Sequence, residues 1–530
     1  MVTRADVEAW IADDVDPAAA AELQALLDAG DEAELADRFA APLEFGTAGL
    51  RGPLRAGPNG MNRTVVRRAA AGLAAWLTDH GRRGAPVVVG FDARYGSHDF
   101  ARDSAAIFAA AGFDALLLPR VLPTPVLAFA VQYLNAAAGV MVTASHNPPQ
   151  DNGYKVYADD GAQIVPPTDR EIEAAIQAVA SAKAIALDED GVTVLGEEIV
   201  TAYVDAIAGL VDDGPRELRI VHTAMHGVGT KTVQAVLDRA GFTDVTPVPQ
   251  QEQPDPDFPT VAFPNPEEPG ALDLAFALAR ERNADIVIAN DPDADRCAVA
   301  VQTDADGGWR MLRGDEVGVL LADWLLRLGI RGTYATTIVS SSMLGALAAK
   351  HDVGYAETLT GFKWISRAAP DLVFGYEEAL GYAVAPDLVR DKDGVSAALR
   401  VAELAARLKA DGSTLLARLD ELAAEYGRYA TDQVSARVDD LSIIGDTMRR
   451  LRATPPTTLL DQPVTVEDLL PATDGLRWRW PGGRVVVRPS GTEPKLKAYL
   501  EVVEPSGSAA VAAEALGQLR SEVEALTTAL

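Results

Sequence analysis

The 530-residue chain contains a single cysteine, Cys297. One thiol cannot form an intrachain disulfide, so the sequence suits a reducing compartment, and we expect a cytoplasmic protein. The N-terminus lacks the basic start and apolar stretch of a signal peptide, and no apolar run approaches the ~20 residues of a membrane span. We therefore expect no membrane partner. We also expect Cys297 to be a small buried apolar residue rather than a reactive thiol.

Basic side chains are scarce, with 47 Lys and Arg against 77 Asp and Glu, and the formal net charge is −30. This balance argues against nucleic acid or an anionic membrane as the main partner. It leaves an anionic substrate possible, because charge is screened over about 8 Å at physiological salt and local cations decide binding in a pocket. The chain also lacks a Walker A loop and a convincing dinucleotide-binding fingerprint.

Short apolar runs alternate with helical patterns along most of the chain, which is typical of α/β units. Each of three segments holds two such runs, and the second run ends in a polar motif. The runs are residues 87–91, 138–142, 219–222, 284–288, 334–339 and 371–374. Ligands of open α/β sheets bind beyond the carboxyl ends of the strands. We therefore expect three related α/β domains whose polar motifs face one cleft.

Domain boundaries follow from these patterns and from the chain length, which predicts three or four domains at about 150 residues each. Residues 1–45 have an Ala/Leu/Glu-rich composition typical of helix. The last segment has central strands and a final amphipathic helix, and so predicts an α+β domain. The predicted domains are residues 1–210, 211–318, 319–434 and 435–530.

Two motifs indicate the chemistry. Residues 143–148 place Ser145 in a Pro-ended turn, and residues 291–296 place Asp291, Asp293 and Asp295 at alternate positions. In extended backbone alternate side chains share a face, so the three carboxylates can converge on a hard divalent cation such as Mg²⁺. A metal beside a serine suggests phosphoryl transfer through that serine. The alternatives are a turn serine bonded to its own backbone and a solvated acidic loop.

A phosphoryl-transfer site of this kind needs cations. Three aspartates, a divalent cation and a phosphoserine sum to a charge of about −3 before substrate arrives. Arg296 adjoins the aspartates, Arg51 ends a Gly-rich loop, and Lys155 follows the serine turn. Each of these could alone be an ordinary surface charge. His146 could orient groups in the site or simply cap the turn.

Three later motifs could bind the rest of a phosphosugar. Residues 488–495 join two late strands, and their backbone amides, hydroxyls and arginine suit a phosphate. The residues concerned are Arg488, Ser490, Gly491, Thr492 and Lys495. Gly361 and Lys363 form a weaker phosphate-loop candidate. Glu377 and Glu378 could accept hydrogen bonds from sugar hydroxyls, and we expect only one of them to face the ligand. The alternatives are a hairpin turn, an ordinary loop and an acidic surface turn.

Taken together, these motifs resemble those of the α-D-phosphohexomutase superfamily over nearly the whole chain. They are Thr-Ala-Ser-His-Asn-Pro, Asp-Pro-Asp-Ala-Asp-Arg, Gly-Tyr-Glu-Glu-Ala-Leu-Gly-Tyr and Arg-Pro-Ser-Gly-Thr-Glu-Pro-Lys, in the family's order. The match is close to the longer type of the phosphoglucomutase/phosphomannomutase branch, which includes phosphopentomutase-like members. The resemblance implies three α/β domains with mixed sheets and a C-terminal α+β domain around a central cleft.

The resemblance also implies roles for single residues. Ser145 would carry a phosphate, and Mg²⁺, one per chain, would be held by Asp291, Asp293, Asp295 and the serine phosphate. Lys155 would match the general acid or base, with Arg51 and Arg296 as active-site cations. The substrate-binding positions would be Glu377 and the loop from Arg488 to Thr492.

We therefore expect an enzyme that interconverts hexose 1-phosphate and hexose 6-phosphate, glucose or mannose, with a sugar 1,6-bisphosphate as activator. Its partner is a small phosphosugar, and the chain is a monomer or homodimer. Ala379 stands where many relatives have a sugar-binding serine, which leaves a phosphopentomutase open. A phosphomonoesterase with the same serine is a further alternative. A non-catalytic sensor is disfavoured because Ser145, Lys155 and the aspartates are all present.

Overall fold

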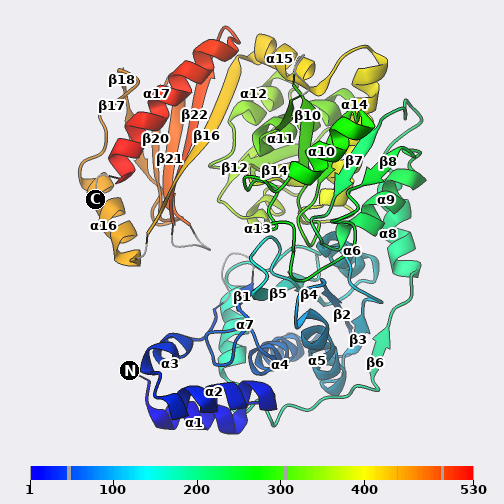
Figure 1. Ribbon diagram of the computed structural model, residues 1–530, viewed down its shortest axis with the longest axis vertical. Helices are drawn as coiled ribbons and strands as arrows, with labels where there is room; N and C mark the ends of the chain where they lie inside the picture. Colours follow the sequence, from blue (N-terminus) through cyan, green and yellow to red (C-terminus); the bar gives the residue numbers. More distant parts are fainter. Residues whose placement is uncertain (1, 45–48, 304–307, 439, 491–494, 529–530) are drawn as a thin grey trace. The chain divides into compact units, whose positions relative to one another are not determined.

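The computed structural model describes residues 2–44, 49–303, 308–438, 440–490 and 495–528. The chain divides into two compact units, whose helices and strands are drawn in Figure 1. Unit 1 comprises Met1–Met311 and Gly381–Arg407, and unit 2 comprises Leu312–Leu380 and Leu408–Leu530. The predicted fold class is confirmed, with α/β domains that have mixed sheets followed by a C-terminal sheet with helices.

Unit 1 begins with three short helices, as the composition of residues 1–45 predicts. They are α1 (Arg4–Asp13), α2 (Pro17–Ala29) and α3 (Glu32–Arg38). Each starts at a side-chain cap, provided by Thr3, Asp16 and Asp31, which satisfies a backbone N–H left free at the helix start.

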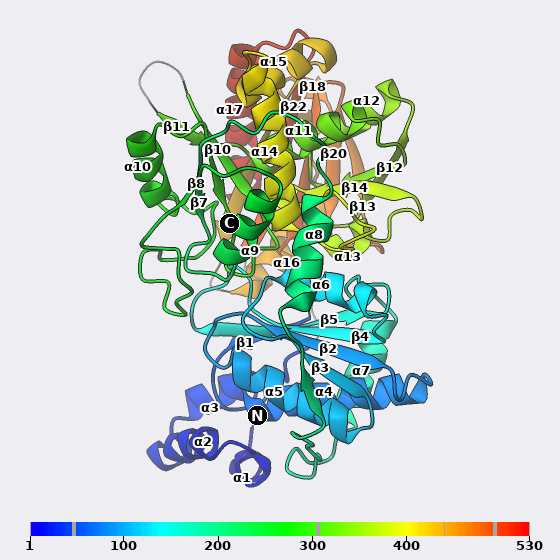
Figure 2. The ribbon, with the colours of Figure 1, turned by 90° about the vertical axis from the view of Figure 1, so that its right-hand side faces the viewer.

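The first sheet of unit 1 has the order β1-β5-β4-β2-β3-β6. Strands β4, β2, β3 and β6 are parallel, while β5 is antiparallel to β4 and β1 is antiparallel to β5. All five residues of β4 are buried, because helices cover both faces of a central parallel strand. Helix α5 packs on one face and α6 on the other (Figure 2). The strands are β1 (Leu50–Pro53), β2 (Pro86–Phe91), β3 (Asp114–Leu117), β4 (Ala138–Val142), β5 (Asp151–Ala158) and β6 (Val192–Val194). The helices are α4 (Arg63–Asp79), α5 (Ser97–Ala110), α6 (Thr124–Tyr133), α7 (Thr168–Gln177) and α8 (Glu198–Ala208).

The second sheet of unit 1 has the order β11-β10-β9-β7-β8. Strands β9 and β10 are antiparallel, and the loop between them carries the three aspartates. The strands are β7 (Ile220–Thr223), β8 (Val245–Pro247), β9 (Ile286–Ala289), β10 (Ala298–Gln302) and β11 (Trp309–Met311). The helices are α9 (Gly229–Arg239) and α10 (Asp273–Arg282).

A later stretch of the chain, residues 381–407, also belongs to unit 1. It contains β15 (Gly381–Ala383) and most of α14 (Gly394–Ala410). Gly381 forms an antiparallel bridge with Arg296. Asp391 accepts hydrogen bonds from Tyr157 and Gln163, and so ties this stretch to the first sheet.

Unit 2 contains three parallel strands, with β12 between β13 and β14. They are β12 (Thr333–Thr337), β13 (Gly354–Thr358) and β14 (Leu372–Glu377), with helices α11 (Gly314–Arg327), α12 (Met343–Lys350), α13 (Phe362–Ile365) and α15 (Leu415–Tyr426). The antiparallel sheet β16-β22-β21-β20-β19 follows, with α17 packed on β16 and β22 (Figure 1). These strands are β16 (Arg428–Arg437), β19 (Thr465–Asp468), β20 (Leu476–Trp480), β21 (Gly483–Pro489) and β22 (Lys495–Glu504). The remaining elements are α16 (Leu441–Ala453), α17 (Ala509–Thr528), β17 (Thr458–Leu459) and β18 (Gln462–Pro463).

A buried arginine joins the two sheets within unit 2. Arg484, on β21, donates to Glu357 Oε1 on β13 at 2.7 Å and lies 3.3 Å from Glu501 Oε1. In the same unit, Ile338 and Val339 pack with Val486 and Tyr499.

Two sequence expectations about burial can be compared with the structure. Cys297 is fully buried, as predicted. Among the described residues, no helix combines the length and the apolar character that crossing a membrane requires.

Candidate active site

Ser145 follows β4 in a tight turn and is 2% exposed. Its φ is +51°, a left-handed value that is uncommon for residues other than glycine. The Ser145 N–H donates to Thr143 Oγ1 at 2.9 Å, which fixes the turn from within. The side chain is thereby held at the carboxyl end of a central strand, which is where the sequence places it.

The serine turn meets the aspartate loop directly. Ser145 Oγ donates to Asp291 Oδ2 at 2.8 Å, across 146 residues of sequence, and lies 3.2 Å from His146 Nδ1. The structure thus brings together the two motifs from which the sequence predicts phosphoryl transfer.

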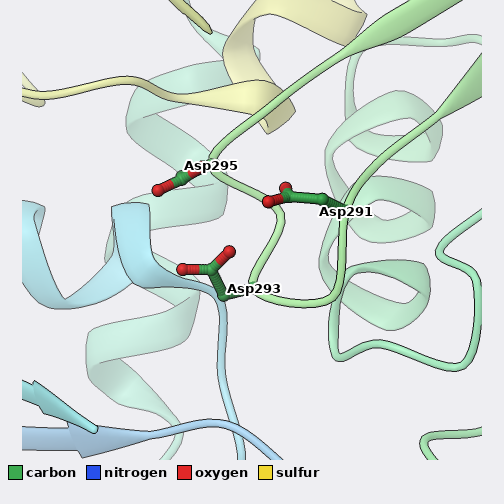
Figure 3. Close-up of side chains that lie close together, drawn as sticks. All are labelled: Asp291, Asp293 and Asp295. Atoms are coloured by element: carbon green, nitrogen blue, oxygen red, sulfur yellow. The ribbon is translucent and has the colours of Figure 1, made fainter. Parts of the chain in front are cut away.

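Asp291, Asp293 and Asp295 point toward one another (Figure 3). Each offers a carboxylate oxygen within 4.8 Å of the other two, and each is at most 1% exposed. The expected extended backbone is wrong, because the loop is a turn in which the Ala294 N–H donates to Asp291 O and Ala294 has a φ of +52°. The side chains converge because the backbone curls around them, not because alternate residues share a face.

Two oxygens of this carboxylate group fit a bound cation. Asp293 Oδ1 and Asp295 Oδ1 are buried, and neither has a hydrogen-bond partner in the part of the chain that the structure describes. Buried carboxylate oxygens without donors are costly unless a cation neutralises them. Burial, together with the neighbouring Asp293 and Asp295 carboxylates, raises the pKa of Asp291 well above its ordinary value. An all-oxygen set of this kind suits Mg²⁺.

Two lysines approach the same carboxylates. Lys155 Nζ, from β5, donates to Asp293 Oδ2 and to Asp295 Oδ2, both at 2.8 Å. Burial opposes the charge on Lys155, but the two aspartates outweigh it and raise the pKa of Lys155 above its ordinary value. Lys392 Nζ lies 3.6 Å from Asp295 Oδ2. The site thus balances its anionic group with ammonium groups from two separate parts of unit 1.

The predicted arginines and His146 border this group. Arg296 Nε lies 3.8 Å from Asp291 Oδ2 and 3.9 Å from Asp295 Oδ1. Arg51, on β1, donates from Nη1 to Asn147 Oδ1 at 3.1 Å, at the other side of the serine turn. Burial, with the nearby positive charge of Arg296 and Arg51, lowers the pKa of His146 well below its ordinary value, so we expect a neutral imidazole.

Sequence reasoning missed three residues of the site. Thr124 Oγ1 donates to Asp293 Oδ2 at 2.7 Å, and Lys392 is described above. Arg94 donates to the carbonyls of Ser145 and Asn147, each at 2.6 Å. The only local signals are the prolines on either side of Thr124, the charged run around Lys392 and the position of Arg94 just after a buried strand.

The predicted sugar-binding residues lie in unit 2. Glu377 ends β14 and is half-buried. The Glu378 carboxylate accepts hydrogen bonds from Ser340 Oγ at 2.8 Å and Thr337 Oγ1 at 3.3 Å, so it holds a turn of its own unit.

The predicted phosphate-binding residues also lie in unit 2. Gly361 precedes the short helix α13 with a φ of +107°, and Lys363 Nζ lies 5.7 Å from the Trp364 ring centroid. Arg488 is near the end of β21, and the Ser490 N–H donates to Lys495 O at 2.8 Å. Gly491 and Thr492 lie outside the described residues, so their predicted roles remain predictions.

Comparisons with known proteins cover nearly the whole chain. Four family models, described as Phosphoglucomutase/phosphomannomutase alpha/beta/alpha domains I, II and III and C-terminal domain, match residues 42–183, 201–307, 313–426 and 446–518. The four matches fall in the order of the four predicted domains.

Two relatives and one solved structure show the range of similarity. The chain is 49% identical over 453 residues to a probable phosphomannomutase of Haemophilus influenzae, covering 83% of this chain and 93% of that protein. It is 36% identical over 572 residues to the phosphopentomutase of Mus musculus, covering 94% and 90%. The crystal structure of a putative phosphomannomutase of Thermus thermophilus is 28% identical with a TM-score of 0.73, covering 91% of this chain and 99% of that one.

Proposed function

Because this chain belongs to the phosphoglucomutase/phosphomannomutase family of the α-D-phosphohexomutase superfamily, and is an enzyme of the mutase type, we propose that it moves a phosphoryl group between O1 and O6 of a hexose phosphate. Glucose and mannose phosphates are the proposed substrates. The similarity to a probable phosphomannomutase at 49% identity supports this choice of sugar class.

A single observation carries the proposal. The hydroxyl of Ser145 donates to Asp291 at 2.8 Å, and both residues are buried at the meeting point of two loops from different sheets. A serine that only stabilises its own turn has no need of a carboxylate from a distant loop. This geometry supports a covalent role for Ser145 beside a cation site.

In the proposed reaction, the phosphorylated Ser145 donates its phosphoryl group to the free hydroxyl of the sugar phosphate. The bond between phosphorus and Ser145 Oγ breaks, a bond to the sugar oxygen forms, and the sugar hydroxyl gives up its proton while Ser145 Oγ gains one. The resulting bisphosphate reorients in the site, so that its other phosphate faces Ser145, and it returns that phosphate to Ser145.

We assign proton transfer to Lys155. Its ammonium group is buried beside Asp293 and Asp295, and its raised pKa keeps it charged in the free protein. In that state it can donate a proton to Ser145 Oγ as the phosphoryl group departs, and the amine so formed can take up the proton that the sugar hydroxyl gives up. Arg51 and Arg296 would oppose the charge of the transferring group.

Asp291, Asp293 and Asp295 would hold Mg²⁺, together with the phosphate on Ser145. When bound, the cation would neutralise charge on the transferring phosphoryl group. In unit 2, Glu377 would accept hydrogen bonds from sugar hydroxyls. The proposed ligands of the phosphate that is not reacting are Lys363, Gly361, Arg488, Ser490, Gly491, Thr492 and Lys495.

Intact-mass measurement of the purified chain, before and after phosphatase treatment, tests the covalent step. We expect a species heavier by one phosphate that disappears on treatment and is never seen in Ser145→Ala. The exposed-loop variant Ser506→Ala is the matched control and should keep the modification. Full turnover by Ser145→Ala would end the proposal.

Phosphopentomutase is the second candidate function, because the murine enzyme is 36% identical over 94% of this chain. Assays on glucose 1-phosphate, mannose 1-phosphate and ribose 1-phosphate in parallel distinguish the two. Steady release of inorganic phosphate would instead indicate a phosphomonoesterase. Binding of phosphosugars without turnover would indicate a sensor.

A further inference from the structure

Arg94 lies behind the serine turn and is 4% exposed. Its Nη2 donates to the carbonyls of Ser145 and Asn147, each at 2.6 Å, and its Nη1 donates to those of Pro148 at 2.7 Å and Asp151 at 3.2 Å. One guanidinium therefore serves four backbone acceptors within a single turn and the start of β5. A planar group with donors in a fixed fork can do this, whereas a lysine ammonium is a point charge with a different geometry.

The guanidinium is itself held from two sides. Arg94 Nε lies 3.4 Å from Asp92 Oδ2, and Asp92 Oδ1 accepts hydrogen bonds from the Arg94 N–H at 3.0 Å and from Ser97 Oγ at 2.6 Å. On its face, the Phe258 ring centroid lies 5.0 Å from the guanidinium carbon. Arg94 is therefore fixed by its own domain and by the long loop after β8.

That loop makes a second contact with the same segment. Tyr95 Oη donates to Asp257 Oδ1 at 3.0 Å, next to Phe258 in sequence. The loop containing Asp257 and Phe258 follows the strand β8 of the second sheet, which is also the sheet that supplies the three aspartates. The serine turn is thus joined to the second-sheet domain at two places, through Ser145 Oγ to Asp291 of the aspartate loop and, behind the turn, through Arg94 to Phe258 of the loop after β8.

We propose that Arg94, backed by Phe258, is a positioning residue that sets the geometry of phosphoryl transfer at Ser145. This inference rests on the proposed function. Ser145 has a left-handed φ, and such a conformation persists only where its surroundings enforce it. Without Arg94, four carbonyls of the turn and the start of β5 lose a donor, and the turn relaxes toward an ordinary conformation. Ser145 Oγ then leaves the position it holds beside Asp291.

The test compares Arg94→Met and Arg94→Lys with the wild-type enzyme on its phosphosugar substrate. A misplacement of about 1 Å costs about 100-fold in rate, so we expect kcat to fall about 100-fold in Arg94→Met with KM changed by less than about threefold. Arg94→Lys should also be impaired, because charge alone does not reproduce the fork. Arg67→Met is the matched control, since Arg67 is a mostly buried arginine of the same domain that binds Asp103.

Chemical rescue separates positioning from general destabilisation. In Arg94→Gly, added guanidinium ion should restore part of the phosphorylation rate of Ser145 by sugar bisphosphate, and the same ion should not help the Arg67 variant. Phe258→Leu keeps Arg94 but removes the ring from a buried site, and we expect a smaller loss of kcat at a temperature where the variant is fully folded. If the Arg94 variants do not fold, the kcat of Phe258→Leu decides whether Arg94 positions Ser145.

The outcomes distinguish the two proposals. If wild-type protein carries no phosphate on Ser145 and shows no mutase activity, the proposed function fails. If wild-type protein is phosphorylated and active, and Arg94→Met or Phe258→Leu retains the wild-type kcat, the positioning role of Arg94 is overturned.

Discussion

Replacing Asp315 with asparagine should stabilise the protein at pH 8 and leave its stability nearly unchanged at pH 4. Asp315, at the start of α11, is buried, and its Oδ1 accepts hydrogen bonds from the Ser341 N–H at 2.6 Å and Tyr376 Oη at 3.1 Å. Asparagine has the same shape and keeps an oxygen for both donors. The variant therefore removes the charge while preserving the contacts.

The magnitude follows from the pKa of this carboxyl group. Burial raises the pKa of Asp315 from 3.8 to about 7, with the Ser341 N–H opposing the shift and the Glu378 and Glu501 carboxylates adding to it. Between these two values the folded state binds a proton that the unfolded state does not. The stability that this proton provides is complete below pH 4 and is lost as the pH rises through 7. About three pKa units correspond to a loss on the order of 4 kcal/mol.

Denaturant unfolding midpoints of wild type and Asp315→Asn, measured between pH 4 and pH 8.5, check this prediction. We expect the difference in the free energy of unfolding to grow with pH and level off above pH 7. Asp432→Asn is a control in which the same substitution should lower the free energy of unfolding instead of raising it. Burial opposes its charge, but a hydrogen bond from Arg520 lowers the pKa of Asp432 below 3.8, so its stabilisation is constant between pH 4 and pH 8.5 and is lost only at more acidic pH. A constant difference for Asp315→Asn across the range would refute the reasoning.

Three further predictions concern single substitutions. An alanine Cβ at Gly394 would lie 2.2 Å from a carbonyl of the aspartate loop, so Gly394→Ala should weaken Mg²⁺ binding as measured by calorimetry. Gly517→Ala is the comparison: Gly517 lies in α17 with open space around it, and the alanine should raise the free energy of unfolding by about 0.5–1 kcal/mol. Thr124→Val removes the hydrogen bond to Asp293 and should lower metal affinity about 10- to 100-fold by the same measurement, and an unchanged affinity would contradict this. Arg484→Met leaves the buried Glu501 carboxylate without its arginine, whereas Glu357 keeps Arg477 at 2.6 Å, and it should destabilise the protein by about 3 kcal/mol in denaturant unfolding; a loss below about 1 kcal/mol would show that the ion pair contributes little.

The sequence predicted those parts of the site that follow a buried strand directly. The all-apolar strand β4 ends at the turn of Ser145, and β9 ends at Asp291, so a local pattern was sufficient to place both motifs at strand ends. The motifs that the chain shares with the superfamily added the order of the four domains. These predictions depend on short-range signals, because apolar runs and turn residues are readable within a few positions.

The remaining features depend on contacts that no local pattern contains. Thr124 reaches Asp293 across 169 residues, and Lys392 approaches Asp295 from a later part of the chain. The backbone of the aspartate loop was predicted wrongly because alternation assumes an extended chain, whereas Ala294 has a left-handed φ and turns the loop. Arg94 was missed because an arginine that serves backbone carbonyls leaves no composition signal.

The passage of the chain between its two units constrains how the enzyme can be taken apart. Residues 381–407 are separated from the rest of unit 1 by Leu312–Leu380, so neither unit is one uninterrupted stretch of polypeptide. A fragment ending at Met311 would contain Ser145 and all three predicted aspartates. It would lose the ammonium group of Lys392, and it would lose Asp391, which accepts hydrogen bonds from Tyr157 and Gln163. Truncation is therefore a poor way to isolate the three-aspartate site, and circularly permuted or split-chain versions that keep residues 381–407 are the suitable minimal forms.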